Sequence, residues 1–274
     1  FIDNPYLIAY EMLNGVDKNF LTGNVNLNYK ITKNLDVMVR SGMELNNELR
    51  TQKRPWSSAN YLQGMYREQH IRLMDLNNDV LFTYRNSFGD FDFSASAGGN
   101  IRYTEYTMND YIAEGLLKPG VYTLPNGIST ISKFARPNDK QVNSAYALAT
   151  LGYQNKIFLD LTARNDWSST LPKENRSYFY PSAATSFILS DIFNLSSDLF
   201  NYWKLRASWS KVGNDTDPYQ LIKYYNNSDF VGSVESPSLY PNPNLRPNMI
   251  TNIEGGMDFT ILKNRINYTI TAYQ

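Results

Sequence analysis

Regular alternation of apolar and polar residues is the feature that most limits what this chain can fold into. The stretch LDLTARNDWSST, residues 159–170, shows it clearly. Its apolar members stand at odd positions and most of its polar members at even ones: Leu159, Leu161, Ala163 and Trp167 against Asp160, Thr162, Arg164 and Asp166. Successive side chains of a β-strand point to opposite faces. The stretch is therefore predicted to be a strand with one apolar and one polar face.

Similar alternating runs recur along most of the chain and are joined in pairs by short polar turns. The predicted turns are residues 32–34, 87–90, 154–156 and 262–264. Between them we expect about ten strands, many of about a dozen residues. Strands of globular proteins usually have about five or six residues, whereas a membrane-crossing strand needs about nine to eleven.

Longer connections alternate with these turns. Segments 47–70, 105–141 and 214–248 are predicted to be long loops, and residues 190–202 to contain one short turn of helix. In an up-and-down sheet, this pattern places the tight turns at one end and the long loops at the other. The prediction is an all-β, antiparallel up-and-down meander.

Nothing in the sequence is suited to cover the apolar side of these strands. We find no convincing amphipathic helix and no apolar run of membrane-helix length. Aromatic residues stand near the ends of the apolar faces, as in the interfacial girdles of membrane barrels: Tyr29, Tyr84, Phe91, Tyr103, Tyr153, Trp167, Phe259 and Tyr268. We therefore expect the apolar face to contact lipid and the polar face to line a watery interior. The alternative is an exposed antiparallel sheet of a secreted β-protein.

Composition and charge exclude several classes of function. Lysine plus arginine and aspartate plus glutamate both total 26, so the zero net charge gives no sign of a nucleic-acid surface. The chain has no cysteine, and His70 is its single histidine, so thiol catalysis and multi-histidine metal sites are excluded within it. Residues 75–79, DLNND, lack the glycine and the final acid of a calcium loop. We expect no catalytic residues, no metal and no cofactor.

Two short motifs are better explained by structure than by chemistry. Asp90 and Asp92 flank a predicted turn, where carboxylates are readily hydrated. Gly98-Gly99 is followed by no helix, so it is not a phosphate loop. A tight bend or close packing is expected at this doublet.

Several stretches resemble the SusC/RagA family of TonB-linked outer-membrane transporters, and the resemblance covers nearly the whole chain. The most specific are LDLTARNDWSSTLP (159–172), SYFYPSAATSFILSDIF (177–193) and WKLRASWSKVGNDTDPYQ (203–220). DNPYLIAYEMLN near the start and NPNLRPNMITNIEGGMDFTILKNRINYTITAY near the end are also similar, in the same order. One departure is Pro247, which follows Arg246 where the family often has Trp, and it could alter the start of the next strand.

The resemblance implies a 22-stranded transmembrane β-barrel closed by a plug, a TonB box upstream, and a surface lipoprotein lid of the SusD type. Both ends of the chain look cut, so residues 1–274 are expected to be a partial barrel domain without the plug and the remaining strands. An isolated piece would leave two strand edges unpaired in lipid. We expect that it transports nothing by itself.

The resemblance also indicates which residues are candidates for a functional role. Aromatic side chains in the predicted loops could stack on a sugar or grip a peptide: Trp56, Tyr61, Tyr66, Tyr106, Tyr111 and Tyr122. Loop packing, or contact with a lid protein, is the favoured alternative for them. Arg102, Asp160 and Arg164 could line a translocation path, although hydrogen-bonded networks with the plug are favoured.

The functional hypothesis is TonB-dependent import of bulky nutrients across the outer membrane of a Gram-negative bacterium. Oligosaccharide is favoured over peptide as cargo, and the implied partners are a SusD-like lipoprotein, TonB and outer-membrane lipid. No covalent chemistry is involved. Two alternatives remain: a passive outer-membrane porin, and a soluble secreted β-module that binds polysaccharide.

Overall fold

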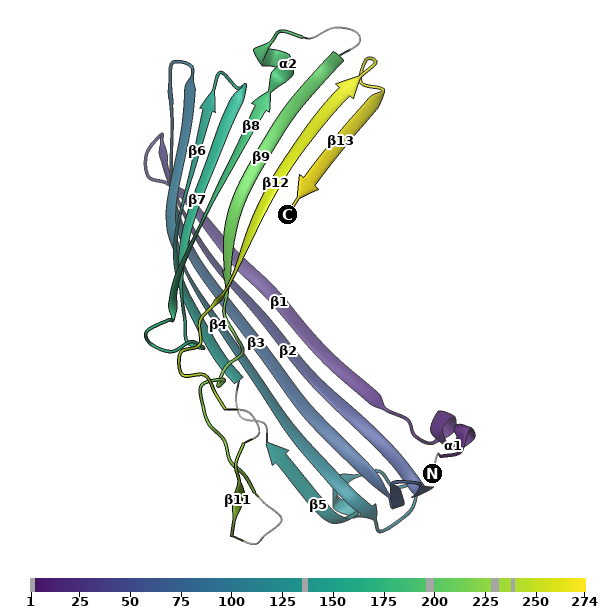
Figure 1. The fold of residues 1–274 in the computed structure, drawn as a ribbon. Coiled ribbons are helices and arrows are strands. Elements are labelled where there is room, and N and C mark those ends of the chain that lie inside the picture. The colour runs from purple at the N-terminus through teal and green to yellow at the C-terminus, as the bar shows by residue number, and fades with distance from the viewer. Residues whose placement is uncertain (1–2, 135–137, 196–199, 228–231, 238–239) are drawn as a thin grey trace. The chain divides into compact units, whose positions relative to one another are not determined.

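β-Strands make up most of the chain in a computed structural model that describes residues 3–134, 138–195, 200–227, 232–237 and 240–274 (Figure 1). The long strands are β1 (Gly15–Lys30), β2 (Leu35–Ser58), β3 (Tyr61–Phe88), β4 (Phe91–Leu116), β6 (Asn138–Tyr153), β7 (Ile157–Ser168), β8 (Ser177–Ile188), β9 (Phe200–Asn214) and β12 (Asn248–Ile261). The shorter elements are α1 (Pro5–Tyr10), η1 (Leu124–Asn126), β5 (Gly127–Phe134), α2 (Leu189–Ile192), β10 (Asn226–Asn227), β11 (Val234–Glu235) and β13 (Ile266–Tyr273).

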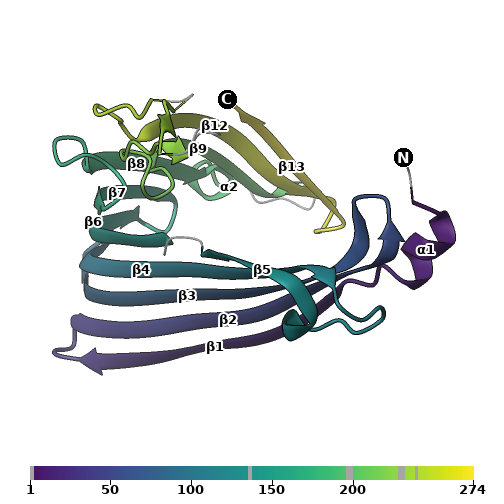
Figure 2. The same cartoon turned by 90° about the horizontal axis from the view of Figure 1, so that it is seen from below.

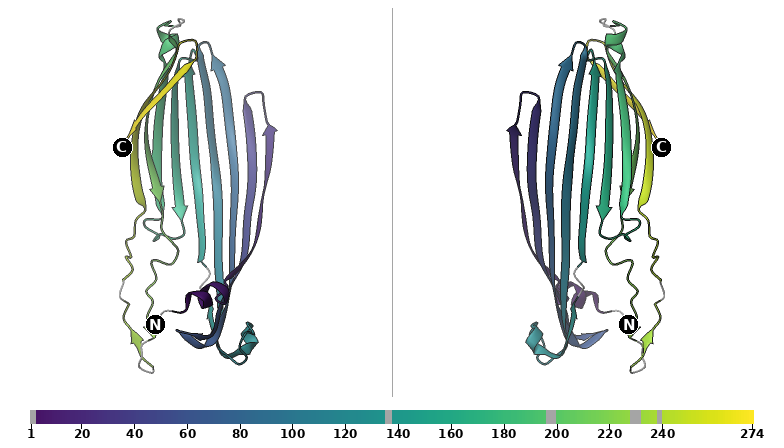
Figure 3. Two further views of the ribbon diagram at one scale, coloured as in Figure 1. Left: turned by 90° about the vertical axis from the view of Figure 1, so that its right-hand side faces the viewer. Right: turned by 90° about the vertical axis from the view of Figure 1, so that its left-hand side faces the viewer.

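Hydrogen bonding places the strands in nearly the same order in the sheet as in the sequence. The order is β1-β2-β3-β4-β6-β7-β8-β9-β12-β13, with β5 paired to β4. Every pair from β6 to β9, and the pairs of β12 with β9 and β13, is antiparallel. Figure 2 shows β1 to β4 side by side, and Figure 3 shows β12 and β13 following β9. The predicted all-β antiparallel meander is confirmed.

Contacts within the chain divide it into two compact units. Unit 1 contains residues 1–25, 42–77 and 103–140, and unit 2 contains residues 26–41, 78–102 and 141–274. Unit 1 has a small core of Tyr66, Ala113 and Leu116, against which Tyr122 and Leu124 pack. Ala113 and Leu116 are completely buried there.

Unit 2 shows the predicted alternation most clearly. Leu159, Leu161 and Trp167 of β7 are 37%, 45% and 37% exposed. Asp166, on the other face, is buried. The polypeptide therefore leaves the apolar face uncovered and uses the polar face for side-chain contacts. Within the described residues, no helix has the length and apolar character needed to cross a membrane.

The predicted tight turns are confirmed. Residues 31–34, 89–90 and 154–156 separate consecutive strands, and residues 262–265 separate β12 from β13. Gln154 and Asn155 have positive φ angles, as do the three consecutive residues 262–264. Asparagine tolerates this left-handed conformation better than most residues. α2 also confirms the short helical turn predicted within residues 190–202.

Two of the three predicted long loops are wrong. β2 and β3 continue through most of residues 47–70 and meet at a two-residue turn, Ala59–Asn60. β4 continues to Leu116, and β5 pairs with it, so residues 105–134 are largely strand, while residues 135–137 lie outside the described residues. Both faces of these segments carry polar residues, so the alternation of hydrophobicity fades although backbone pairing continues. The third segment, 214–248, is mostly irregular where it is described.

Candidate functional site

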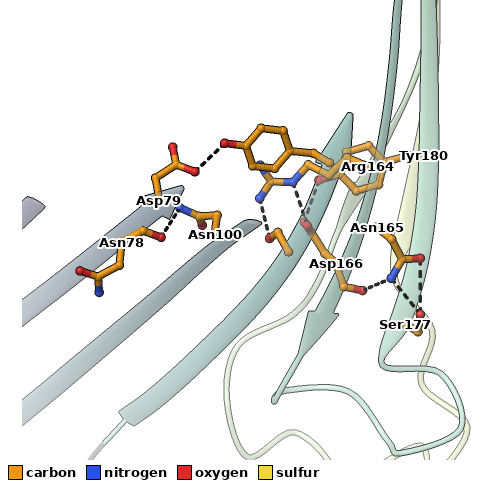
Figure 4. Close-up of polar contacts among 10 residues, drawn as sticks. Asn78, Asp79, Asn100, Arg164, Asn165, Asp166, Ser177 and Tyr180 are labelled. Atoms are coloured by element: carbon orange, nitrogen blue, oxygen red, sulfur yellow. Dashed lines mark hydrogen bonds and ion pairs between the residues drawn. The ribbon is translucent and has the colours of Figure 1, made fainter. Parts of the chain in front are cut away.

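A network of charged and hydroxyl side chains occupies the polar face of unit 2 (Figure 4). At its centre, Arg164 of β7 donates from Nε to Asp166 Oδ1 at 2.8 Å, and from Nη2 to Ser144 Oγ, also at 2.8 Å. Tyr180 of β8 lies opposite Arg164 in the strand register and donates to Asp166 Oδ2 at 2.7 Å. Both carboxylate oxygens of Asp166 are therefore satisfied, which offsets the cost of burying its charge.

A second buried carboxylate, Asp79 of β3, is held by side chains from two other strands. Arg40 of β2 donates to its Oδ2 at 2.9 Å, and Tyr146 of β6 donates to its Oδ1 at 2.5 Å. The Arg164 guanidinium lies 5.8 Å from the centre of the Tyr146 ring, close enough for a cation–π contact. Tyr146 thus links the Asp79 and Asp166 parts of the network.

Glycine makes this link possible, because β4 lies between β3 and β6 and Tyr146 must cross it. A Cβ added to Gly98 of β4 would lie 3.0 Å from Cζ and from Oη of Tyr146, and it would overlap the carbonyl oxygen of Val80. The ring therefore occupies the space that a side chain at residue 98 would need. The close packing expected at Gly98-Gly99 is confirmed for Gly98.

Arg206 crosses a strand in the same way. It lies on β9 over Gly256 of β12, and its Nη2 donates to Thr271 Oγ1 of β13 at 2.6 Å. Its Nη1 lies 3.3 Å from Glu254 Oε1, and its Nε lies 3.5 Å from Asp258 Oδ2. The long side chain is held along the sheet by partners on two strands.

The chemistry of this face is ion pairing and hydrogen bonding. Within the described residues, no group of three or more His, Asp or Glu side chains is placed to hold a metal ion. The carboxylates at the centre of the network are held by arginine and tyrosine. The arrangement suits a hydrated, electrically balanced wall.

The three polar residues singled out from the sequence lie in three different settings in the structure. Arg164 lies at the centre of the network. Asp160, four residues before Arg164 on the same face of β7, accepts a hydrogen bond from Thr150 Oγ1 at 2.7 Å. Arg102 is an exposed residue of β4. Asp79, Tyr146 and Tyr180 were not singled out from the sequence as site residues, and the Gly98-Gly99 doublet is the sequence sign of close packing beside them.

The six aromatic candidates all lie in unit 1 but do not form one site. Tyr66 belongs to the core and Tyr122 packs against it, with Lys53 Nζ 5.5 Å from the Tyr122 ring centre. Tyr111 makes an edge contact with His70, with ring centres 5.8 Å apart. The other three are 39% exposed or less: Trp56, Tyr61 and Tyr106. Packing occupies Tyr66 and Tyr122, whereas Trp56 offers the most accessible ring.

Burial of Tyr66 predicts a stability change at high pH. Burial, together with a hydrogen bond to Glu68, raises its pKa from 10.0 to about 12. The neutral phenol is favoured in the folded state, so its stabilising contribution is complete below pH 10 and is lost as the pH rises toward 12. In the full-length protein, tyrosinate absorbance and circular dichroism should show unit 1 loosening over this range. A Tyr66→Phe variant should lack this component, and an unchanged profile in that variant would contradict the assignment.

Long antiparallel strands in sequential order, an uncovered apolar face and an internally paired polar face define the wall of a membrane β-barrel. The comparison with known proteins gives the particular family. The model of the family described as "TonB dependent receptor-like, beta-barrel" matches residues 3–274. This chain belongs to that family.

Curated relatives match along almost the whole chain. TonB-dependent receptor P3 of Formosa agariphila is 24% identical over 99% of the chain and 28% of its own length. TonB-dependent receptor SusC of Bacteroides thetaiotaomicron is 27% identical over 98% of the chain and 28% of its own length. The chain spans less than a third of each of these relatives.

Solved structures show the same fold. The structure of the RagAB peptide transporter superimposes with a TM-score of 0.84 at 19% identity, covering 98% of this chain and 31% of that one. The siderophore receptor PiuA of Acinetobacter baumannii gives a TM-score of 0.54 at 13% identity, covering 94% of this chain and 40% of that one. At these identities the likeness is one of fold.

Proposed function

We propose that residues 1–274 are part of the barrel of a TonB-dependent transporter in the outer membrane of a Gram-negative bacterium. The observation that carries the proposal is the family match over residues 3–274. The uncovered apolar face of β7 supports a membrane setting, because a sheet in water would need a covering layer. The family is one of receptors and transporters rather than enzymes.

The proposed activity is energy-coupled import of a bulky nutrient together with a SusD-like surface lipoprotein. The likeness to SusC and to the RagAB peptide transporter supports a partnered importer. Oligosaccharide is the first cargo to test and peptide the second. The paired arginines on the polar face favour neither a strongly anionic nor a strongly cationic cargo.

Growth and uptake by a strain that encodes the full-length protein test this function. Deletion of the gene should abolish uptake of one oligosaccharide or peptide from a labelled panel, and complementation should restore it. Collapse of the proton gradient should stop uptake, because TonB draws its energy from the inner membrane. Uptake that persists without that energy would favour the porin. Recovery of the full-length protein outside the membrane fraction would favour the secreted module.

A further inference from the structure

A shallow groove in unit 1 lies where the run of apolar residues on one face of its strands is interrupted. On β1 to β4, this apolar run is interrupted after Leu21, Leu45, Met74 and Tyr103. Residues two apart on a strand share a face. Continuing along each strand in steps of two, the next residues on this face are polar or charged: Asn19 and Asp17, Asn47, Arg72 and His70, and Glu105, Thr107 and Asn109.

These polar residues converge on one groove. It has a volume of about 520 Å³, and seven of them line it: Asp17, Asn19, Asn47, His70, Arg72, Thr107 and Asn109. The first five are exposed and the last two half-buried. Glu48, Leu49 and Ile71 also line the groove, and Leu49 shares the face of Asn47 on β2. Hydrogen-bonding residues therefore outnumber apolar ones at this level of the four strands.

We infer that this groove binds the saccharide headgroup of a glycolipid in the outer leaflet, while the acyl chains lie along the adjoining apolar residues. The inference rests on the membrane location proposed above and concerns a site separate from any cargo path. Amide, hydroxyl and carboxylate side chains suit sugar hydroxyls, which both donate and accept hydrogen bonds. Arg72 adds a forked donor for a headgroup phosphate.

Continuity between the two surfaces favours a lipid over a free sugar. Leu21 is 56% exposed and Met43, on the same face of β2, is 39% exposed. A ligand with a polar head and apolar chains can contact the groove and these residues together, whereas a free saccharide meets the groove alone. Burying apolar chain against apolar side chain adds about 25 cal/mol per Å².

Retention of lipid by the full-length protein tests the inference. The protein is purified from outer membranes, exchanged into detergent, and its bound lipid counted by native mass spectrometry after incubation with purified lipopolysaccharide. The wild type should retain the glycolipid, and Asn47→Ala/Arg72→Ala should retain several-fold less. The matched control is Asn28→Ala/Arg85→Ala, which removes the same residue types from the opposite face of β1 and β3 and should retain as much as wild type. Heat-dependent migration on gels verifies that each variant is folded.

Competition experiments distinguish a glycolipid from ligands that share only its phosphate and chains or only its saccharide. Phosphatidylglycerol, which has a phosphate and chains but no saccharide, should displace the glycolipid poorly. The free core oligosaccharide, which has no chains, should also displace it poorly. Equal retention by both double variants, no retention by wild type, or full displacement by either competitor would overturn the inference. Import is not measured here, so loss of uptake in the growth experiment would count against the proposed function alone.

Discussion

Replacing Leu161 by arginine is expected to destabilise the folded full-length protein by about 2–4 kcal/mol, the cost of a basic side chain near the middle of a bilayer. Leu161 lies midway along the apolar face of β7 and is 45% exposed. If lipid covers this face, the guanidinium must lose water or bend toward an interface. Urea unfolding in lipid vesicles, followed by tryptophan fluorescence, measures the effect.

The neighbouring residue supplies the control. Asp160 is exposed on the opposite face of the same strand, and its carboxylate accepts one hydrogen bond from Thr150. Asp160→Arg introduces the same side chain on the side proposed to be wet, so its cost should be about 1 kcal/mol or less. Equal destabilisation by the two variants would show that lipid does not contact the apolar face.

The apolar face was predictable because its signal is local. In residues 159–167, alternation identifies the strand and the two faces without knowledge of any partner strand. The short turns were predictable for the same reason, since their residue types and lengths are local properties. Antiparallel order then follows from hairpins whose strands are joined by two to four residues.

The extension of β2 and β3 beyond the apolar run could not be predicted from hydrophobicity. Residues 47–58 and 61–72 are strands in which polar residues occur on both faces, so the period of two is lost. Their pairing is stabilised by backbone hydrogen bonds, which any sequence other than proline can make. A polar segment between two alternating runs therefore looks like a loop whether it is paired or not.

The settings of the aromatic candidates and of the polar network depend on contacts that the local sequence does not show. An aromatic residue in an apparent loop carries no local sign of whether it packs in a core, as Tyr66 does, or stays partly exposed, as Trp56 does. Tyr146 and Asp79 are 67 residues apart in the sequence. Their hydrogen bond depends on which strand lies between them, and Arg164 was identified only because its own strand has a clear polar face.

Replacing Gly98 by alanine should destabilise the full-length protein by about 1–3 kcal/mol, the usual cost of overfilling a packed site. The new methyl group would overlap the Val80 carbonyl oxygen and crowd the Tyr146 ring, so Tyr146 would have to release Asp79 or the backbone of β4 would have to shift. Gly98 has no positive φ angle, so the effect would come from crowding rather than backbone strain. Urea unfolding in lipid vesicles provides the measurement.

Gly99 provides the matched comparison, because it is the next residue of the same strand and its side chain would point to the other side. The nearest atom to a Cβ at Gly99 is the Ser144 carbonyl oxygen at 3.4 Å, an ordinary contact distance. Gly99→Ala should therefore change stability by less than about 1 kcal/mol. In a Tyr146→Ala background the crowding ring is absent, so Gly98→Ala should cost less there than in the wild type, and the cost that remains reports the overlap with Val80. If the single Gly98 variant is as stable as wild type, the ring does not fill the space above this glycine, and Tyr146 does not cross β4 to reach Asp79.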